Sequence, residues 1–153
     1  MRCLVVYFSR KGYTAAYAKN IAAQQHADLL ELRTPERTRG IAGFWWCGRF
    51  GMLRREMPLC PLSIDPSAYE RVVLCAPVWV FSMAAPMWAF LRRYGRQISS
   101  LDCVLLHFSS PMRYSRTLKQ IDHILGKPHH TFTSVQCVLG HILREKSFPT
   151  LSK

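Results

Sequence analysis

The sequence has 153 residues, enough for one domain with its own core, and 49% hydrophobic with 20% charged residues exclude a disordered chain. The formal net charge of +12 predicts anionic partners, but the cations are too dispersed for a nucleic-acid tail, so we expect no specific nucleic acid. No apolar run approaches the ~20 residues of a membrane span, and the N-terminal residues lack a signal-peptide pattern. We therefore expect a single cytoplasmic domain over residues 1–153.

The first half of the chain predicts two strands around one helix. The apolar run at residues 4–8 predicts a strand that is buried on both faces. Small residues at helical spacing predict a helix over residues 14–25, with Thr14 as its N-cap. Alternation over residues 28–32 predicts a half-exposed strand, and residues 33–69 form the least regular stretch.

The second half alternates between strands and helices more clearly. Apolar runs predict strands over residues 72–76, 103–108 and 131–139. Helices are expected over residues 85–94, where Pro86 suits the first turn, and 115–125, which Gly126 ends. This order of elements predicts an α/β fold, a doubly wound five-stranded parallel sheet of order 2-1-3-4-5. Few residues follow the fifth strand, so we expect the last helix to be short or absent.

A small polar loop follows the first strand and leads into the first helix. Its two hydroxyls, two cations and one glycine, next to the free N–H groups of a helix start, are typical of an anion site, with phosphate as the obvious ligand. An ordinary strand-to-helix turn has a similar composition, so both interpretations stay open here. The residues of this loop are Ser9, Arg10, Lys11, Gly12, Tyr13 and Thr14.

In a sheet of this order the first and third strands are neighbours, and the loops at their carboxyl ends open a crevice between them. The second of these loops is residues 77–82. Here Trp79 and Phe81 offer flat apolar surface to a ring system, although packing in the core is the simpler role for both.

The sequence resembles the flavodoxin family in three stretches, over roughly residues 2–126. Residues 7–14, Tyr-Phe-Ser-Arg-Lys-Gly-Tyr-Thr, resemble its phosphate loop, and residues 76–79 with Ala85-Pro86 resemble its second flavin loop. Residues 43–55 resemble the weaker segment between them. The resemblance implies a noncovalent FMN, used for electron transfer or for NAD(P)H-linked reduction, and no side-chain acid, base or nucleophile.

By position, the resemblance assigns FMN contacts to three loops. The phosphate would lie against residues 9–14. The flavin ring would face Pro77, Val78, Trp79, Val80 and Phe81. Its far edge would be lined by Ser109, Ser110, Pro111 and Met112.

The sequence also departs from the pattern of the family. Lys11 and Tyr13 stand where threonine and asparagine are usual, Phe81 replaces a small residue, and Pro111-Met112 replaces the glycines of the third loop. An alternative is therefore a flavodoxin-like interaction module without catalytic activity. A short or absent last helix would expose apolar sheet surface and favour a homodimer. The positive charge predicts an acidic redox partner protein, beside NAD(P)H as a small-molecule donor.

The remaining motifs exclude other chemistry. Six cysteines without a C-x-x-C pair indicate a reducing compartment rather than a disulfide framework, and we expect no metal. The His129-His130 pair is interpreted as part of a solvated loop. A phosphoacceptor receiver domain needs acidic residues where Ser9 and Ala76 stand, and a Walker-type motif is absent. Cys3 lies too far from the first loop to be a phosphatase nucleophile.

Overall fold

The structure, a computed structural model, describes residues 2–9, 12–35, 57–79, 82–107, 114–138 and 141–149. No helix in these ranges is long and apolar enough to cross a membrane.

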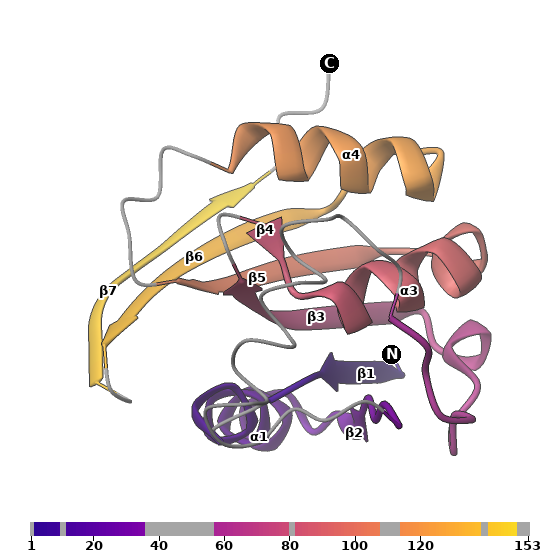
Figure 1. The fold of residues 1–153 in the computed structure, drawn as a ribbon, viewed down its shortest axis with the longest axis horizontal. Helices are drawn as coiled ribbons and strands as arrows, with labels where there is room; N and C mark the ends of the chain where they lie inside the picture. Colours follow the sequence, from indigo (N-terminus) through magenta and orange to yellow (C-terminus); the bar gives the residue numbers. More distant parts are fainter. Residues whose placement is uncertain are drawn as a thin grey trace.

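A twisted sheet with parallel strands forms the centre of the molecule (Figure 1). The five parallel strands are β1 (Cys3–Tyr7), β2 (Asp28–Glu31), β3 (Arg71–Trp79), β5 (Leu101–His107) and β6 (Thr131–Val138). They lie in the order β2-β1-β3-β5-β6, which is the predicted order 2-1-3-4-5. The described helices are α1 (Tyr13–Gln25), α3 (Ala85–Tyr94) and α4 (Ser115–Leu125), with short 3-10 turns at Pro66–Ala68 and Gly95–Gln97.

The prediction of five strands is wrong, because two further strands join the sheet. β4 (Ser82–Met83) pairs antiparallel with the end of β3. β7 (His141–Pro149) pairs antiparallel with β6 and forms an additional edge strand where a short tail was expected. All nine residues of β7 are exposed, so this strand lacks the alternation of buried and exposed positions that marks a strand in a sequence.

Helices cover both faces of the sheet, and alternate residues of each central strand enter two separate cores. α3 and α4 pack on the face that carries Leu4, Leu74 and Leu105. α1 packs on the opposite face, which carries Val5 and Val73 (Figure 1). β1 is buried along its whole length, as predicted for a strand between two layers of helices. β1 ends at Tyr7, and the loop that leads to α1 follows it.

The start of α3 and the end of α4 follow local signals that were visible in the sequence. Pro86 lies in the first turn of α3, where its missing N–H costs nothing. Gly126 ends α4 at φ 75°, a left-handed conformation that favours glycine. The atoms nearest to a Cβ at Gly126 would belong to the flexible Arg96 side chain, which can move, so the positive φ rather than close packing favours glycine here.

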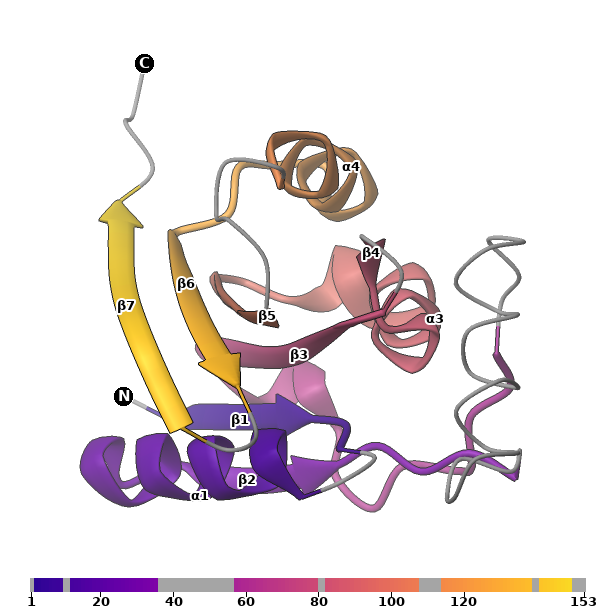
Figure 2. The same ribbon diagram turned by 60° about the vertical axis from the view of Figure 1, so that its left-hand side comes forward.

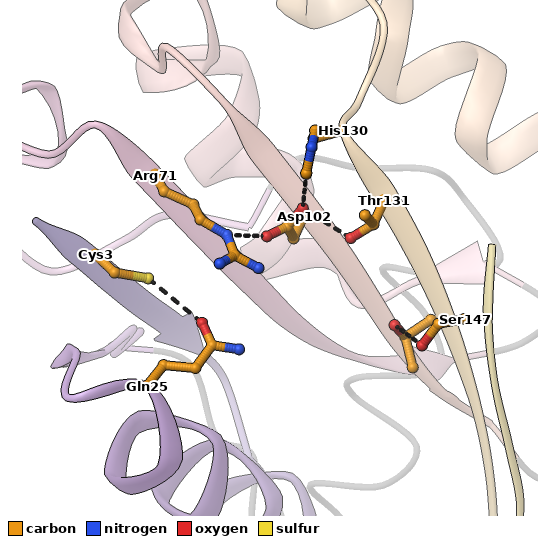
Figure 3. Close-up of polar contacts among 8 residues, drawn as sticks. Cys3, Gln25, Arg71, Asp102, His130, Thr131 and Ser147 are labelled. Carbon is orange, nitrogen blue, oxygen red and sulfur yellow. Dashed lines mark hydrogen bonds and ion pairs between the residues drawn. The ribbon is translucent and has the colours of Figure 1, made fainter. Parts of the chain in front are cut away.

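An ionic cluster around the buried Asp102 carboxylate joins three strands at the amino edge of the sheet (Figure 3). The Asp102 carboxylate accepts hydrogen bonds from Arg71 Nε, from His130 Nδ1 at 2.9 Å and from Thr131 Oγ1 at 2.7 Å. Burial alone would raise the pKa of Asp102, but these three hydrogen bonds outweigh it and lower the pKa below the usual value for aspartate. We call Arg71, Asp102, His130 and Thr131 the amino-edge cluster.

The second histidine of the His129-His130 pair belongs to this cluster, and the first also binds a carboxylate. His129 Nδ1 lies 2.7 Å from Asp122 Oδ1, which also accepts the His129 backbone N–H at 2.8 Å. The prediction of a merely solvated loop therefore missed two carboxylate contacts. Within the described ranges, no group of three histidine, cysteine or acidic side chains is arranged to hold a metal ion.

The described cysteines are free thiols, and three of them are buried as small apolar side chains. Burial raises the pKa of the Cys75 thiol to about 12 and raises that of Cys103 as well. These thiols are therefore protonated and unreactive at neutral pH. Cys47 lies outside the described residues.

Candidate functional site

The loop after β1 leads into an uncapped helix start. Gly12 is the N-cap of α1 at φ 94°, and no side chain caps the helix. The Gly12 N–H donates to Ser9 Oγ at 2.9 Å, so this bond joins the described residues on either side of Arg10 and Lys11. The first N–H groups inside α1, those of Tyr13, Thr14 and Ala15, have no acceptor within the helix. These groups, with the positive end of the helix dipole, suit an anion.

The predicted N-cap, Thr14, is wrong. Thr14 lies inside the first turn of α1 and its side chain is buried, whereas the N-cap is two residues earlier. The reason is the left-handed conformation of Gly12, which an L-residue adopts only at a cost, and which starts the helix earlier. Tyr13, by contrast, is 42% exposed and does not fill the loop from inside.

Strand pairing places the second predicted loop next to the first. β1 and β3 are parallel neighbours, and the last residue of β1, Tyr7, pairs with Cys75. β3 then continues for four residues, to Trp79, past the end of β1. Residues 76–79 therefore extend along the carboxyl edge beside the segment that joins β1 to α1. The predicted neighbouring of these two strand ends is confirmed, and the crevice between the loops stays a prediction.

The second loop is a hairpin rather than an irregular turn. Pro77, Val78 and Trp79 belong to β3, and Val78 and Trp79 pair with Met83 and Ser82 of β4. The Pro77 carbonyl accepts the Ala84 N–H at 2.9 Å, which turns the chain directly into α3. Pro77 and Val78 are half-buried, so part of each remains on the surface. The hairpin fixes the backbone of these residues more firmly than a loop would.

A third group of residues flanks the third predicted loop, and the sequence did not single it out. His107 ends β5, is buried, and its Nε2 hydrogen-bonds Ser134 Oγ of β6. Its ring lies 5.0 Å from that of the buried Tyr114, the residue before α4. These contacts fix the positions of His107 and Tyr114, the residues on either side of 108–113. The only signal in the sequence was a polar residue near the end of an apolar strand.

The electrostatics at the start of α1 favour an anion over a cation. The first turn of α1 contains no acidic residue, and the first acidic residue after the loop is Asp28. The donors in the described part of the loop are backbone N–H groups and hydroxyls, which bind phosphate oxygens rather than metal ions. The arrangement can hold a phosphorylated ligand.

Part of the predicted site lies outside the described residues. The loops at the edges of β1 and β3 bring together Ser9, Gly12, Tyr13, Thr14, Pro77, Val78 and the backbone of Trp79. Outside the described residues lie Arg10, Lys11, Val80, Phe81, Ser109, Ser110, Pro111, Met112 and the side chain of Trp79. Their predicted contacts with FMN stay predictions.

Comparison with known proteins finds likeness in structure rather than in sequence. No protein-family model matches the chain, and no curated protein matches it. A flavoprotein of Lactobacillus acidophilus, solved in complex with FMN, is 16% identical with a TM-score of 0.64, over 87% of this chain and 90% of that chain. A protein of Bacteroides eggerthii described as a flavoprotein is 15% identical with a TM-score of 0.69, over 92% and 89%.

A third similar structure extends the agreement to a flavodoxin. The WrbA-like flavodoxin of Agrobacterium tumefaciens is 13% identical with a TM-score of 0.55, over 91% of this chain and 86% of that chain. At these identities the likeness concerns the arrangement of strands and helices. The chain therefore has a flavodoxin-like fold, as its resemblance to that family implied.

Proposed function

We propose that this chain is a cytoplasmic FMN-binding flavodoxin-like protein that carries out electron transfer or NAD(P)H-linked reduction. The observation that supports this most strongly is the pairing of Tyr7 with Cys75, which puts the start of α1 and the end of β3 at one edge of the sheet. A crevice at this edge, where the strand order reverses, is where α/β sheets of this kind bind their ligands. Buried free thiols agree with a reducing compartment.

The phosphate of FMN would lie at the start of α1. The N–H groups of Tyr13, Thr14 and Ala15 would donate to its oxygens, and Gly12 would let the backbone approach them closely. Arg10 and Lys11 would add positive charge to this loop. The residues present suit the group, because the first turn of α1 carries hydroxyls and N–H donors and no carboxylate.

The flavin ring would lie against the β3–β4 hairpin. Half-buried Pro77 and Val78 offer it apolar surface, and the hairpin holds their backbone in place. Trp79 and Phe81 would add aromatic surface, while Ser109 to Met112 would line the far edge. When bound, FMN supplies the redox chemistry, and the residues of this chain bind the cofactor, orient it and exclude water from it.

The partners follow from charge and from the cofactor. A net charge of +12 favours an acidic redox partner protein, and NAD(P)H is the proposed small-molecule donor. A salt titration should weaken binding to such a protein because screening reduces attraction between surface charges.

Retention of FMN through gel filtration tests this proposal directly. Purified protein is mixed with FMN, and we expect the flavin absorption bands to elute with the protein peak. Titrations that follow flavin fluorescence would then compare FMN with riboflavin, which lacks the phosphate. We expect at least tenfold tighter binding of FMN, because one charge-assisted contact of about 1.4 kcal/mol already gives that factor. Equal affinity for both would contradict a phosphate site at α1.

A second candidate function is a flavodoxin-like interaction module without catalysis. The observation that favours it is β7, whose exposed side chains include Ile142, Leu143 and Phe148. The same gel-filtration experiment separates the two candidates, because only the first requires the protein to retain FMN.

A further inference from the structure

The outer edge of β7 has no strand partner among the described residues, so another strand could pair with it. β7 ends the sheet, and within the described residues its only strand partner is β6 (Figure 2). It is nine residues long, more than twice the length of β2 at the opposite edge. Its backbone N–H and C=O groups that point away from β6 are therefore free to pair with a further chain.

One face of β7 carries two cations and an aromatic ring in alternate positions. Register places Arg144, Lys146 and Phe148 opposite Gln136, Ser134 and Phe132 of β6. Phe148 stacks on Phe132 with ring centroids 6.0 Å apart, yet it stays 47% exposed. No ion pair in the described part of the chain includes Arg144 or Lys146. This face is therefore a row of two uncompensated positive charges followed by apolar surface.

The acidic residue of β7 does not neutralise this row. Glu145 pairs with Val135 and so projects from the opposite face of the strand. There its Oε1 accepts a hydrogen bond from the Tyr17 hydroxyl at 2.8 Å, which engages this carboxylate with α1. The two cations of the row keep their charge for a partner.

The same charges oppose pairing of β7 with a second copy of itself. A two-fold antiparallel pair centred on Glu145 would place Arg144 opposite Lys146. Pairs centred on Arg144 or Lys146 would place each of these cations opposite its own copy. Like charges directly opposite one another destabilise a strand pair, and the net charge of +12 adds repulsion between whole molecules. In these three registers β7 therefore disfavours a second copy of this chain, and its charges favour a partner of opposite charge.

We infer that the free edge of β7 binds an extended acidic peptide segment of a partner protein, which adds a strand to the sheet. The segment would carry acidic residues at two alternate positions, opposite Arg144 and Lys146, and an apolar residue opposite Phe148. Main-chain hydrogen bonds would supply affinity, and these three side chains would supply specificity. This inference does not depend on FMN binding, because it uses no residue of the candidate flavin site.

Synthetic peptides as long as β7 test the inference. The test peptide has glutamates at two alternate positions and, two residues before the first, a valine, so that an antiparallel strand would meet all three side chains. A matched peptide replaces the glutamates with lysines, and another carries N-methyl groups along one edge of its backbone. We expect the acidic peptide to bind at least tenfold more tightly than either control, with hydrogen exchange slowed in β7.

Charge reversal on the protein supplies the matched control. The double variant Arg144→Glu/Lys146→Glu should weaken binding of the acidic peptide about tenfold and restore binding of the lysine peptide. Arg116→Glu/Lys119→Glu makes the same charge change at exposed positions of α4 and should leave both affinities nearly unchanged. Thermal unfolding of both variants shows that they fold.

Several outcomes would overturn the inference. These are no binding of the acidic peptide, equal effects of the two double variants, protection of amides outside β6 and β7, or undiminished binding of the N-methylated peptide. A concentration-dependent dimer that pairs through β7 would also overturn it, because the edge would then accept a second copy of the chain.

Discussion

The amino ends and the carboxyl ends of the parallel strands, here the amino edge and the carboxyl edge of the sheet, differ in how their polar groups are used. At the amino edge, the Asp102 carboxylate receives three hydrogen bonds from β3 and from the start of β6. At the carboxyl edge, α1 begins without a side-chain cap, and its first N–H groups have no acceptor in the helix. The amino edge, where the polar groups pair with one another, stabilises the fold, and we call it the closed edge. The carboxyl edge, where helix N–H groups have no acceptor within the helix, is the proposed phosphate site, and we call it the open edge. Variants at the two edges should therefore affect different measurements.

The largest effect is expected from Asp102→Ala. It leaves Arg71, His130 and Thr131 without their shared acceptor, the first and last at half-buried positions, so the free energy of unfolding should fall by about 3 kcal/mol. Asp122→Ala, which removes a half-exposed carboxylate beside His129, should cost only about 1 kcal/mol. Urea denaturation measures both, and equal losses would contradict the contrast. Neither variant should alter the affinity for FMN.

At the open edge, Gly12→Asp should lower FMN affinity about 100-fold, equivalent to about 2.7 kcal/mol. Its carboxylate would repel the phosphate, while the space around Gly12 is open, so no clash is expected. Gly12→Asn is the matched control, because asparagine has a similar shape, has no charge and tolerates a positive φ. Fluorescence titration with FMN distinguishes the two. Equal losses would show that conformation at Gly12, rather than charge, decides binding.

A smaller effect is expected from pH at the closed edge. The folded-state pKa of Asp102 is lowered, so its contribution to stability is complete above the ordinary aspartate pKa of about 3.9 and is lost as the pH falls through the folded value. The difference in stability between the natural protein and Asp102→Asn should therefore be constant near neutral pH and shrink below about pH 4. Denaturation series at several pH values measure it; a difference that does not change down to pH 3 would contradict it.

The smallest effect is expected from Tyr17→Phe, which removes the hydrogen bond to Glu145. The free energy of unfolding should fall by about 0.5–1 kcal/mol, because Glu145 is exposed and can bind water instead. Burial, and then this hydrogen bond, raise the pKa of Tyr17, so its contribution is complete below pH about 10 and is lost as the pH rises further. Glu145→Gln keeps an acceptor and should cost less. An alkaline unfolding profile that Tyr17→Phe leaves unchanged would contradict this account.

The sequence predicted the parts of the fold that depend on local pattern. Three features show this. The continuous apolar run of β1 suits a strand buried on both faces, Pro86 suits the first turn of α3, and Gly126 suits the left-handed end of α4. The strand order followed from the alternation of strands and helices. Strand β7 was missed because all its residues are exposed and three successive residues, 144–146, are charged. The length of β3 was missed because Pro77 is typical of a chain break; it is tolerated there because β1 has already ended opposite Cys75.

The candidate site was predictable in place and less so in detail. Topology alone put the loops after β1 and β3 together, since the carboxyl ends of parallel neighbours share one edge. Thr14 was misplaced as the N-cap because the sequence pattern did not show that Gly12 takes the left-handed conformation from which the helix begins. His107 was missed because its hydrogen-bond partner, Ser134, comes from a distant part of the sequence, and Tyr114 because its ring contact with His107 follows from the fold and not from a local pattern.

The link between Tyr17 and Glu145 spans 128 positions of the sequence. It connects the helix whose first turn would hold a phosphate to the edge strand that offers a surface to a partner. Replacing either side chain therefore tests whether the two proposed binding regions are coupled: if they are, Tyr17→Phe should change binding at both.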